Sequence, residues 1–175
     1  LYTRQGTLFV DQTTAIIRKL PALEVAVHAR RVRNLPLYFS FDSSIAGLHR
    51  RDAAARSSAL VGRVDIHPRI EIPILRGGAF SWSHQLGVRE TYYSDRQKVG
   101  DQRDSLNRVA FDYGFVFNGP QLEKQYSKWK HVIEPQAEYR YVSGVDDFGN
   151  TLLIDDTDLF VNTNEVRYGI SNRIF

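Results

Sequence analysis

A strict alternation of apolar and polar residues is the feature that most constrains this chain. From Arg63 to Ile74 the even positions all hold apolar residues or proline, and the odd positions from 63 to 71 hold charged residues or histidine. A helix cannot separate these two sets, whereas successive side chains of a β-strand point to opposite faces. The stretch therefore predicts a strand with one apolar face and one ionic face.

The same alternation recurs along most of the chain. Six further segments show it, at residues 23–30, 37–45, 80–92, 108–118, 133–141 and 165–174. Short connections at 33–36 and 76–78 alternate with longer polar ones at 50–58, 94–104 and 143–163, although the connection 119–128 breaks this parity. About seven antiparallel strands are expected, joined alternately by short turns and long loops as in outer-membrane barrels. Residues 13–20 and 53–61 are expected to form short helices if they are not strands.

Composition narrows the class of protein. With 42% hydrophobic and 25% charged residues the chain is expected to fold, and the absence of cysteine excludes disulfides and thiol chemistry. No apolar run exceeds three residues, which excludes a membrane-spanning helix. Crossing an apolar band of about 25 Å takes a tilted strand roughly ten residues, and several segments reach this length, against five or six in most soluble sheets. The pattern favours an all-β fold, a segment of an antiparallel up-and-down transmembrane β-barrel.

Several readings of the architecture remain open from the residues alone. Bacterial barrels have at least eight strands, so either residues 1–20 add a strand or the chain is an internal piece of a larger barrel. Phe175 falls in the polar frame of the last strand and Leu1 is not a methionine, so we expect a truncated chain. Residues 1–20 are expected to be a loop or partial strand, and 21–175 a barrel segment. One alternative is a small eight-stranded porin-like or enzyme barrel. Another is a soluble carbohydrate-binding sandwich with Phe111, Tyr113 and Phe115 buried between two sheets.

Four motifs, in order, resemble the LptD family of lipopolysaccharide-assembly proteins, also called organic solvent tolerance proteins. Residues 130–142 (KHVIEPQAEYRYV) are similar to a strand of that family with the pattern H-x-[IL]-E-P followed by Y-x-Y. Residues 20–24 (LPALE), 64–73 (VDIHPRIEIP) and 164–173 (NEVRYGISNR) are similar to three of its other strands, and residues 158–160 (DLF) to one of its loops. The resemblance extends over residues 20–175.

This resemblance implies a fold, a function and a set of partners. LptD proteins combine a periplasmic jellyroll with a large outer-membrane barrel, which inserts lipopolysaccharide into the outer leaflet of Gram-negative bacteria. The chain would be the middle of that barrel, with lipopolysaccharide, an LptE-like lipoprotein plug, the periplasmic transport bridge and outer-membrane lipids as partners. It lacks the jellyroll, the gate strands and the usual cysteines of the family. We expect no catalysis and no cofactor.

The residues predicted to line an aqueous lumen share the ionic frame of the alternation. They are Asp42, Arg63, Asp65, His67, Arg69, Glu71, Arg89, Asp112, Glu134, Glu138, Arg140, Glu165 and Arg167. One interpretation is a hydrated lumen that solvates the plug and the saccharide part of lipopolysaccharide; the other is a set of cross-strand salt bridges that fix register. The 18 arginines suit lipid A phosphates, but interleaved acidic residues favour neutralisation within the chain.

Metal and nucleic-acid sites are not expected. No two of the five histidines have a ligand spacing such as H-x-x-x-H, and no basic run or RNA-binding aromatic motif occurs. Five aspartates crowd one loop and suit calcium in number but not in order, so a solvated external loop is favoured: Asp146, Asp147, Asp155, Asp156 and Asp158. His84 and Glu90 lie in an apolar frame, where contact with lipid would be unfavourable. Trp82 and the pair Tyr92 and Tyr93 are expected at opposite membrane interfaces.

Overall fold

One antiparallel sheet contains almost all of the regular structure. The computed structural model describes residues 16–51, 60–75, 80–96, 104–146, 148–151 and 153–175. Its elements are β1 (Ile16–Arg31), β2 (Tyr38–Arg51), β3 (Val61–Leu75), β4 (Ser81–Tyr93), β5 (Leu106–Asn118), β6 (Leu122–Gln125), β7 (Lys130–Ser143), the short 3₁₀-helix η1 (Phe148–Asn150) and β8 (Thr163–Ile174). The predicted all-β antiparallel class is confirmed. Of the stretches expected to be helical, residues 16–20 belong to β1, and 53–59 lie outside the described residues.

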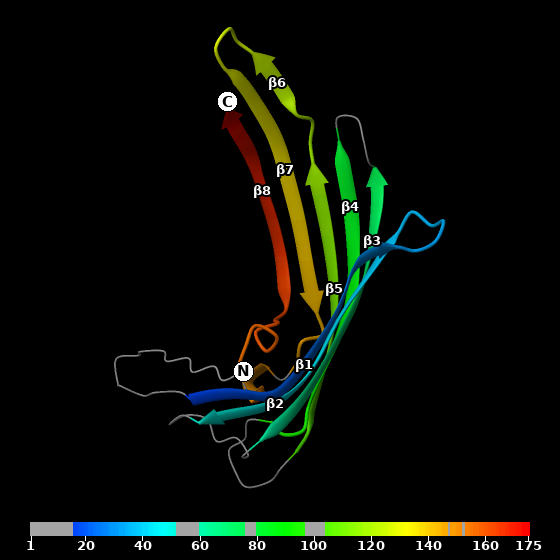
Figure 1. The fold of residues 1–175 in the computed structure, drawn as a ribbon, viewed down its shortest axis with the longest axis vertical. Coiled ribbons are helices and arrows are strands. Elements are labelled where there is room, and N and C mark those ends of the chain that lie inside the picture. Colours follow the sequence, from blue (N-terminus) through cyan, green and yellow to red (C-terminus); the bar gives the residue numbers. More distant parts are fainter. Residues whose placement is uncertain (1–15, 52–59, 76–79, 97–103, 147, 152) are drawn as a thin grey trace.

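The sheet is open. Each strand pairs with the next in the chain from β1 to β5, β5 pairs with β7, and β7 pairs with β6 and β8. In the described residues β1 and β8 each have one neighbour, so the two ends of the sheet do not meet. Figure 1 shows the resulting curved surface, with β1 and β8 at its two edges. This arrangement confirms an incomplete barrel segment and does not give the closed eight-stranded barrel of the alternative interpretation.

Strand β6 explains the connection that broke the turn parity. β6 pairs with the first part of β7, from Leu122↔Ile133 to Gln125↔Lys130, and β5 pairs with the rest of β7, from Asn118↔Gln136 onward. β5 and β6 therefore follow the same edge of β7 as one interrupted strand. The true turn is the short segment 126–129, closed by the Tyr126 amide donating to the Trp129 carbonyl at 2.8 Å. The eight strands occupy seven positions across the sheet, and the turn parity holds.

The two ends of the sheet differ in their connections. The strands that the short connections 32–37, 76–80 and 126–129 join have their linked ends at one end of the sheet, which we call the short-turn end. Residues 52–60, 94–105 and 144–162 connect strands at the opposite, long-loop end. Apart from β6, the strands have 12 to 16 residues, more than the roughly ten that cross a bilayer core. No helix in the described ranges is long and apolar enough to span a membrane.

Among the described residues, no second layer covers the apolar face of this single sheet. Large hydrophobic side chains on it remain exposed along every long strand, among them Ile45, Ile70, Val88, Phe111, Tyr141 and Tyr168. Phe111 retains 42% of its accessible surface. The soluble-sandwich interpretation, which required Phe111 to lie between two sheets, is therefore wrong.

The junction of β5 and β6 predicts a sensitive glycine. A Cβ on Gly119 would lie 2.5 Å from Cγ of the rigid Pro135 ring, and the Gly119 amide donates to the Pro135 carbonyl at 2.8 Å. Gly119→Ala is expected to open this contact and lower the free energy of unfolding by about 1–3 kcal/mol, as overpacking generally does. Denaturant titration in lipid and hydrogen exchange of the β6 amides would measure the loss.

Gly169→Ala on β8 is the matched control, because a Cβ there meets nothing within 4 Å. Equal effects of the two substitutions would contradict this account.

Candidate functional site: the charged face and its inserted loop

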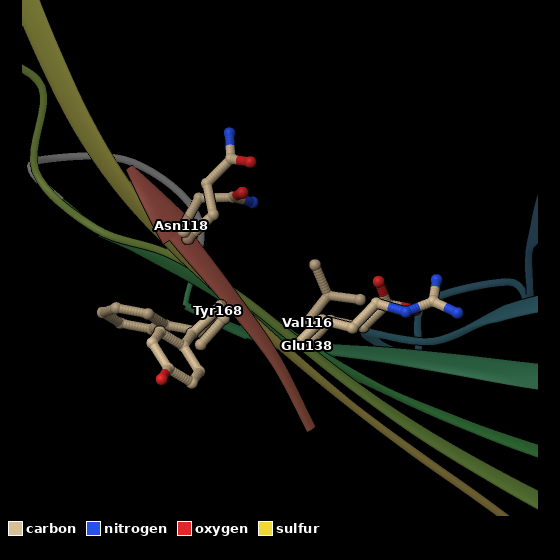
Figure 2. A pocket seen from close by; sticks show the side chains of 9 residues that line it. Val116, Asn118, Glu138 and Tyr168 are labelled. Carbon is tan, nitrogen blue, oxygen red and sulfur yellow. The ribbon is translucent and has the colours of Figure 1, made fainter. Parts of the chain in front are cut away.

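The pairing register places every residue predicted to line a lumen on one face of the sheet. Directly paired residues of antiparallel strands point to the same side, and the pairs Asp42↔His67, Gly87↔Asp112 and Glu138↔Arg167 link the strands into one ionic frame. We call this side the charged face. Figure 2 shows the separation at β5, β7 and β8, where Val116 and Glu138 project from one side of the ribbon and Tyr168 from the other.

Cross-strand ion pairs connect the centre of the charged face. Arg89 of β4 makes two hydrogen bonds to the Asp65 carboxylate of β3, at 2.9 and 3.0 Å, and the Thr91 hydroxyl donates to the same carboxylate at 2.6 Å. Arg69 of β3 pairs with Asp42 of β2. The expected register-fixing salt bridges are thus present, and the fork of Arg89 on Asp65 has the bidentate geometry that adds direction as well as energy.

A glycine permits one contact that skips a strand. His67 Nε2 lies 2.9 Å from Asp112 Oδ2, although β4 runs between β3 and β5. At that point β4 has Gly87, where any Cβ would collide with the Asp112 carboxylate. The missing side chain leaves the space in which His67 and Asp112 meet. One hydrogen bond thus links β3 to β5 across β4.

The loop between β7 and β8, residues 144–162, folds onto the charged face at the long-loop end. Arg63 of β3 donates to Asp155 through two nitrogens at 2.7 Å each and to Asp158 at 2.8 Å. The Tyr93 hydroxyl of β4 donates to the same Asp158 oxygen at 2.6 Å. Arg63, Tyr93 and Asp158 are each 1% exposed or less. We call residues 144–162 the inserted loop.

These contacts correct two expectations. The solvated external loop is wrong for Asp158, which is fully buried against Arg63, and Asp147 lies outside the described residues. The interfacial position expected for Tyr93 is also wrong, because Tyr93 points to the charged face while Tyr92 remains exposed on the apolar side. Within the described residues no group of three or more histidines and acidic residues has a geometry that would hold a metal ion.

Backbone groups complete the polar network of the inserted loop. Asp158 Oδ2 accepts hydrogen bonds from the amides of Ile154 and Asp155 at 2.8 and 3.0 Å. Arg108 of β5 donates to the carbonyls of Asp158 at 3.3 Å and Phe160 at 2.7 Å. A buried carboxylate that lacked such partners would carry a large desolvation penalty, so the network accounts for how Asp158 is tolerated at this depth.

Two apolar clusters hold the inserted loop on either side of this network. Ile154 packs against a buried cluster on β2 to β5, composed of Ala46, Leu48, Val61, Tyr93 and Leu106. Phe160 packs against a second buried cluster, composed of Ala110, Val142 and Val145. The Phe160 ring also lies 5.1 Å from the Arg89 guanidinium and 6.2 Å from the His67 ring. The loop is therefore packed as a core element and closes the charged face at this end.

The pKa of the Asp155 carboxyl reflects the contacts that hold the loop. Burial alone would raise the pKa of its carboxyl, but the hydrogen bonds and charge of Arg63, together with Lys19 and the Thr157 amide, lower the pKa to about 2 from an ordinary 3.8. The ionised carboxylate is thus the form that the docked loop stabilises.

The charged face stays open toward the short-turn end. The half-buried Glu165 pairs with the exposed Arg167 within β8, and Arg173 of β8 pairs with Glu134 of β7 at 2.9 Å. A shallow pocket of about 290 Å³ lies among β5, β7 and β8, and Figure 2 shows some of its lining side chains. Of the predicted residues, Arg63 joins the inserted loop, and the others with contacts form separate pairs: Arg69 with Asp42, Arg89 with Asp65, His67 with Asp112, Arg167 with Glu165, and Glu134 with Arg173.

The polar residues of the apolar face have partners on that face. His84 Nδ1 lies 2.8 Å from the Tyr113 hydroxyl, and its ring lies 5.3 Å from that of Phe115. Glu90 accepts a hydrogen bond from the Asn107 amide at 3.0 Å. Pairing reduces the penalty of placing these groups against hydrocarbon, because a satisfied polar group is less unfavourable there than a bare one.

Removing the buried guanidinium should release the inserted loop. Arg63→Met leaves Asp158 buried without its cation, and we expect loop docking to weaken by about 3–5 kcal/mol, the usual result of breaking a buried ion pair. Limited proteolysis between residues 144 and 162 of the membrane-inserted protein would measure the change. Arg69→Met is the control on the same strand, since its pair with Asp42 is about half exposed and is worth about 0–1 kcal/mol. Unchanged cleavage in Arg63→Met would refute the assigned role.

Loop docking should also weaken in acid. The folded pKa of Asp155 is depressed, so its stabilisation is complete above the unfolded pKa near 3.8 and disappears as the pH falls through about 2. Hydrogen exchange of the loop amides should therefore rise between pH 4 and pH 2. In Asp155→Asn this component of the pH dependence is expected to vanish, and its persistence would assign the titration to another group.

Comparison with known protein families identifies the family of this chain. The family model for LptD, described as LPS transport system D, matches residues 6–175. A search of curated proteins found no match. The matched range contains the whole sheet, the charged face and the inserted loop. This chain belongs to the LptD family, whose members transport lipopolysaccharide at the outer membrane of Gram-negative bacteria.

Proposed function

We propose that residues 21–175 form part of the wall of an outer-membrane barrel through which lipopolysaccharide reaches the outer leaflet. The observation that carries this proposal is the division of the sheet into an uncovered apolar face and an ion-paired charged face. A soluble sheet buries its apolar side, whereas a barrel wall turns that side to lipid. The LptD family match supports lipopolysaccharide as the cargo.

The apolar face has the chemistry of a lipid contact. Aliphatic and aromatic side chains follow each other from β1 to β8, and the polar groups among them, such as His84 and Glu90, are hydrogen-bonded. A charged residue at the bilayer midplane of a barrel costs about 2–4 kcal/mol, so the ionic side chains can only face water. We infer that the thirteen residues of the predicted lumen set line this aqueous interior.

The partners follow from the two ends of the charged face. Short turns lie on the periplasmic side of outer-membrane barrels, which places the inserted loop toward the cell exterior. The open part near Glu138 and Arg167 is then the region accessible to an LptE-like plug and to lipopolysaccharide delivered by the periplasmic bridge. Its carboxylates and guanidinium groups suit sugar hydroxyls and phosphates, since both hydrogen-bond strongly to charged groups.

Neighbouring positions on β5 provide a direct test. Val116 points to the charged face, while the adjacent Phe117 points to the apolar face. A photo-crosslinking residue at position 116 should capture lipopolysaccharide in living cells, and the same residue at position 117 should capture phospholipid. The two sites are adjacent in the chain and equally deep, so depth and expression are matched.

Lipopolysaccharide adducts that are equally frequent at both positions, or absent at position 116, would contradict the proposed path.

A further inference from the structure

We propose that the short-turn end docks on a layer of anionic phospholipid headgroups, with the β6–β7 hairpin as the main contact. The inference rests on the proposed membrane orientation and adds a surface and a ligand class that the transport role does not supply. The hairpin is defined as residues 122–131. In Figure 1 it stands at the same end of the sheet as the end of β3 and the start of β4.

Basic residues are concentrated in the hairpin. It contains Lys124, Lys128 and Lys130, three of the five lysines of the chain, and a single acidic residue, Glu123. Three lysines and one glutamate give a net charge of +2, against +3 for all 175 residues. Lys130 pairs with Glu123 at 2.7 Å, so Lys124 and Lys128, both exposed, carry the charge that is available to a partner.

Aromatic rings shape the tip of the hairpin. Tyr126 and Trp129 stack with their centroids 3.7 Å apart and an interplanar angle of 15°, and Lys124 Nζ lies 5.2 Å from the centre of the Tyr126 ring. Trp129 keeps 40% of its surface exposed. Tryptophan and tyrosine concentrate at the headgroup level of membranes because each has an apolar body and a polar tip. Lysines beside them can reach lipid phosphates through their long side chains.

The neighbouring short turn is also basic, whereas the inserted loop at the opposite end of the sheet is acidic. In the connection after β1, Arg31 and Arg33 are exposed without any acidic residue from 31 to 37, and Leu35 beside them is 51% exposed. The inserted loop, by contrast, contains five aspartates and no basic residue. Anionic headgroups attract such basic clusters near a membrane surface. This asymmetry favours a lipid layer, which extends under all the turns, over a partner that contacts the hairpin alone.

The two tryptophans of the chain allow each surface to be tested separately. Trp82 lies on the apolar face of β4 and Trp129 in the hairpin. Trp82→Phe leaves Trp129 as the only reporter, and Trp129→Phe leaves Trp82. The probe is a vesicle of phosphatidylcholine with or without phosphatidylglycerol. We expect phosphatidylglycerol to reduce acrylamide quenching of Trp129 at least twofold, and high salt to reverse the effect.

Charge variants decide whether the lysines are responsible. The double variant Lys124→Gln/Lys128→Gln should lose the dependence on phosphatidylglycerol, and Lys124→Arg/Lys128→Arg should keep it. Bromines on the acyl chains should quench Trp82 in each charge variant that also carries Trp129→Phe, which verifies insertion.

The possible failures are distinct. If bromines quench Trp82 but acrylamide quenching of Trp129 does not depend on phosphatidylglycerol, this inference is overturned and the proposed function stands. Trp82 that bromines do not quench would overturn the proposed function itself. Protection of Trp129 that requires an added acidic periplasmic protein instead of anionic lipid would also overturn the inference.

Discussion

Placing ionic side chains against hydrocarbon is so unfavourable that it determines how this sheet can be used. An arginine at the midplane of a barrel wall costs about 2–4 kcal/mol and a carboxylate somewhat less, and thirteen ionisable residues occupy one face of the strands. In the proposed orientation that face meets water or charged partners, and the apolar face meets lipid. Strand length, turn parity and pairing register are all compatible with this single orientation. A shift of one residue in any strand would reverse it.

The inserted loop shows the same physics on a smaller scale. Arg63 is buried completely, which is tolerable only because Asp155 and Asp158 surround its guanidinium. Asp158 in turn is held by Tyr93 and by backbone amides of its own loop. Removing Arg63 would leave the buried Asp158 carboxylate without its cation. The loop therefore packs as part of the sheet and covers one end of the charged face.

The two ends of the sheet are consequently different surfaces. At the long-loop end, apolar clusters around Ile154 and Phe160 and the Arg63 network fill the concave side. At the short-turn end, the charged face is open and the turns are basic and aromatic. In the proposed transport path this difference suits an amphipathic, anionic lipid, because the lipid would enter and leave along surfaces of different chemistry. The arrangement leaves the region of Glu138 and Arg167 as the accessible part of the interior.

The sequence by itself determined the strands and their two faces, because a period of two residues is a local property that any window of the chain displays. It placed Asp65 and Arg89 on one face correctly, and the direct pairing of neighbouring strands then brought them together. It did not determine that β5 is interrupted before β6, that Tyr93 turns inward, or that Asp158 is buried. The bond from Arg63 to Asp158 joins residues 95 positions apart, and no local pattern records such a distance. Only the tertiary structure decided that Asp158 is buried. A cluster of carboxylates in a sequence predicts a solvated loop, and only the fold places the buried Arg63 beside it.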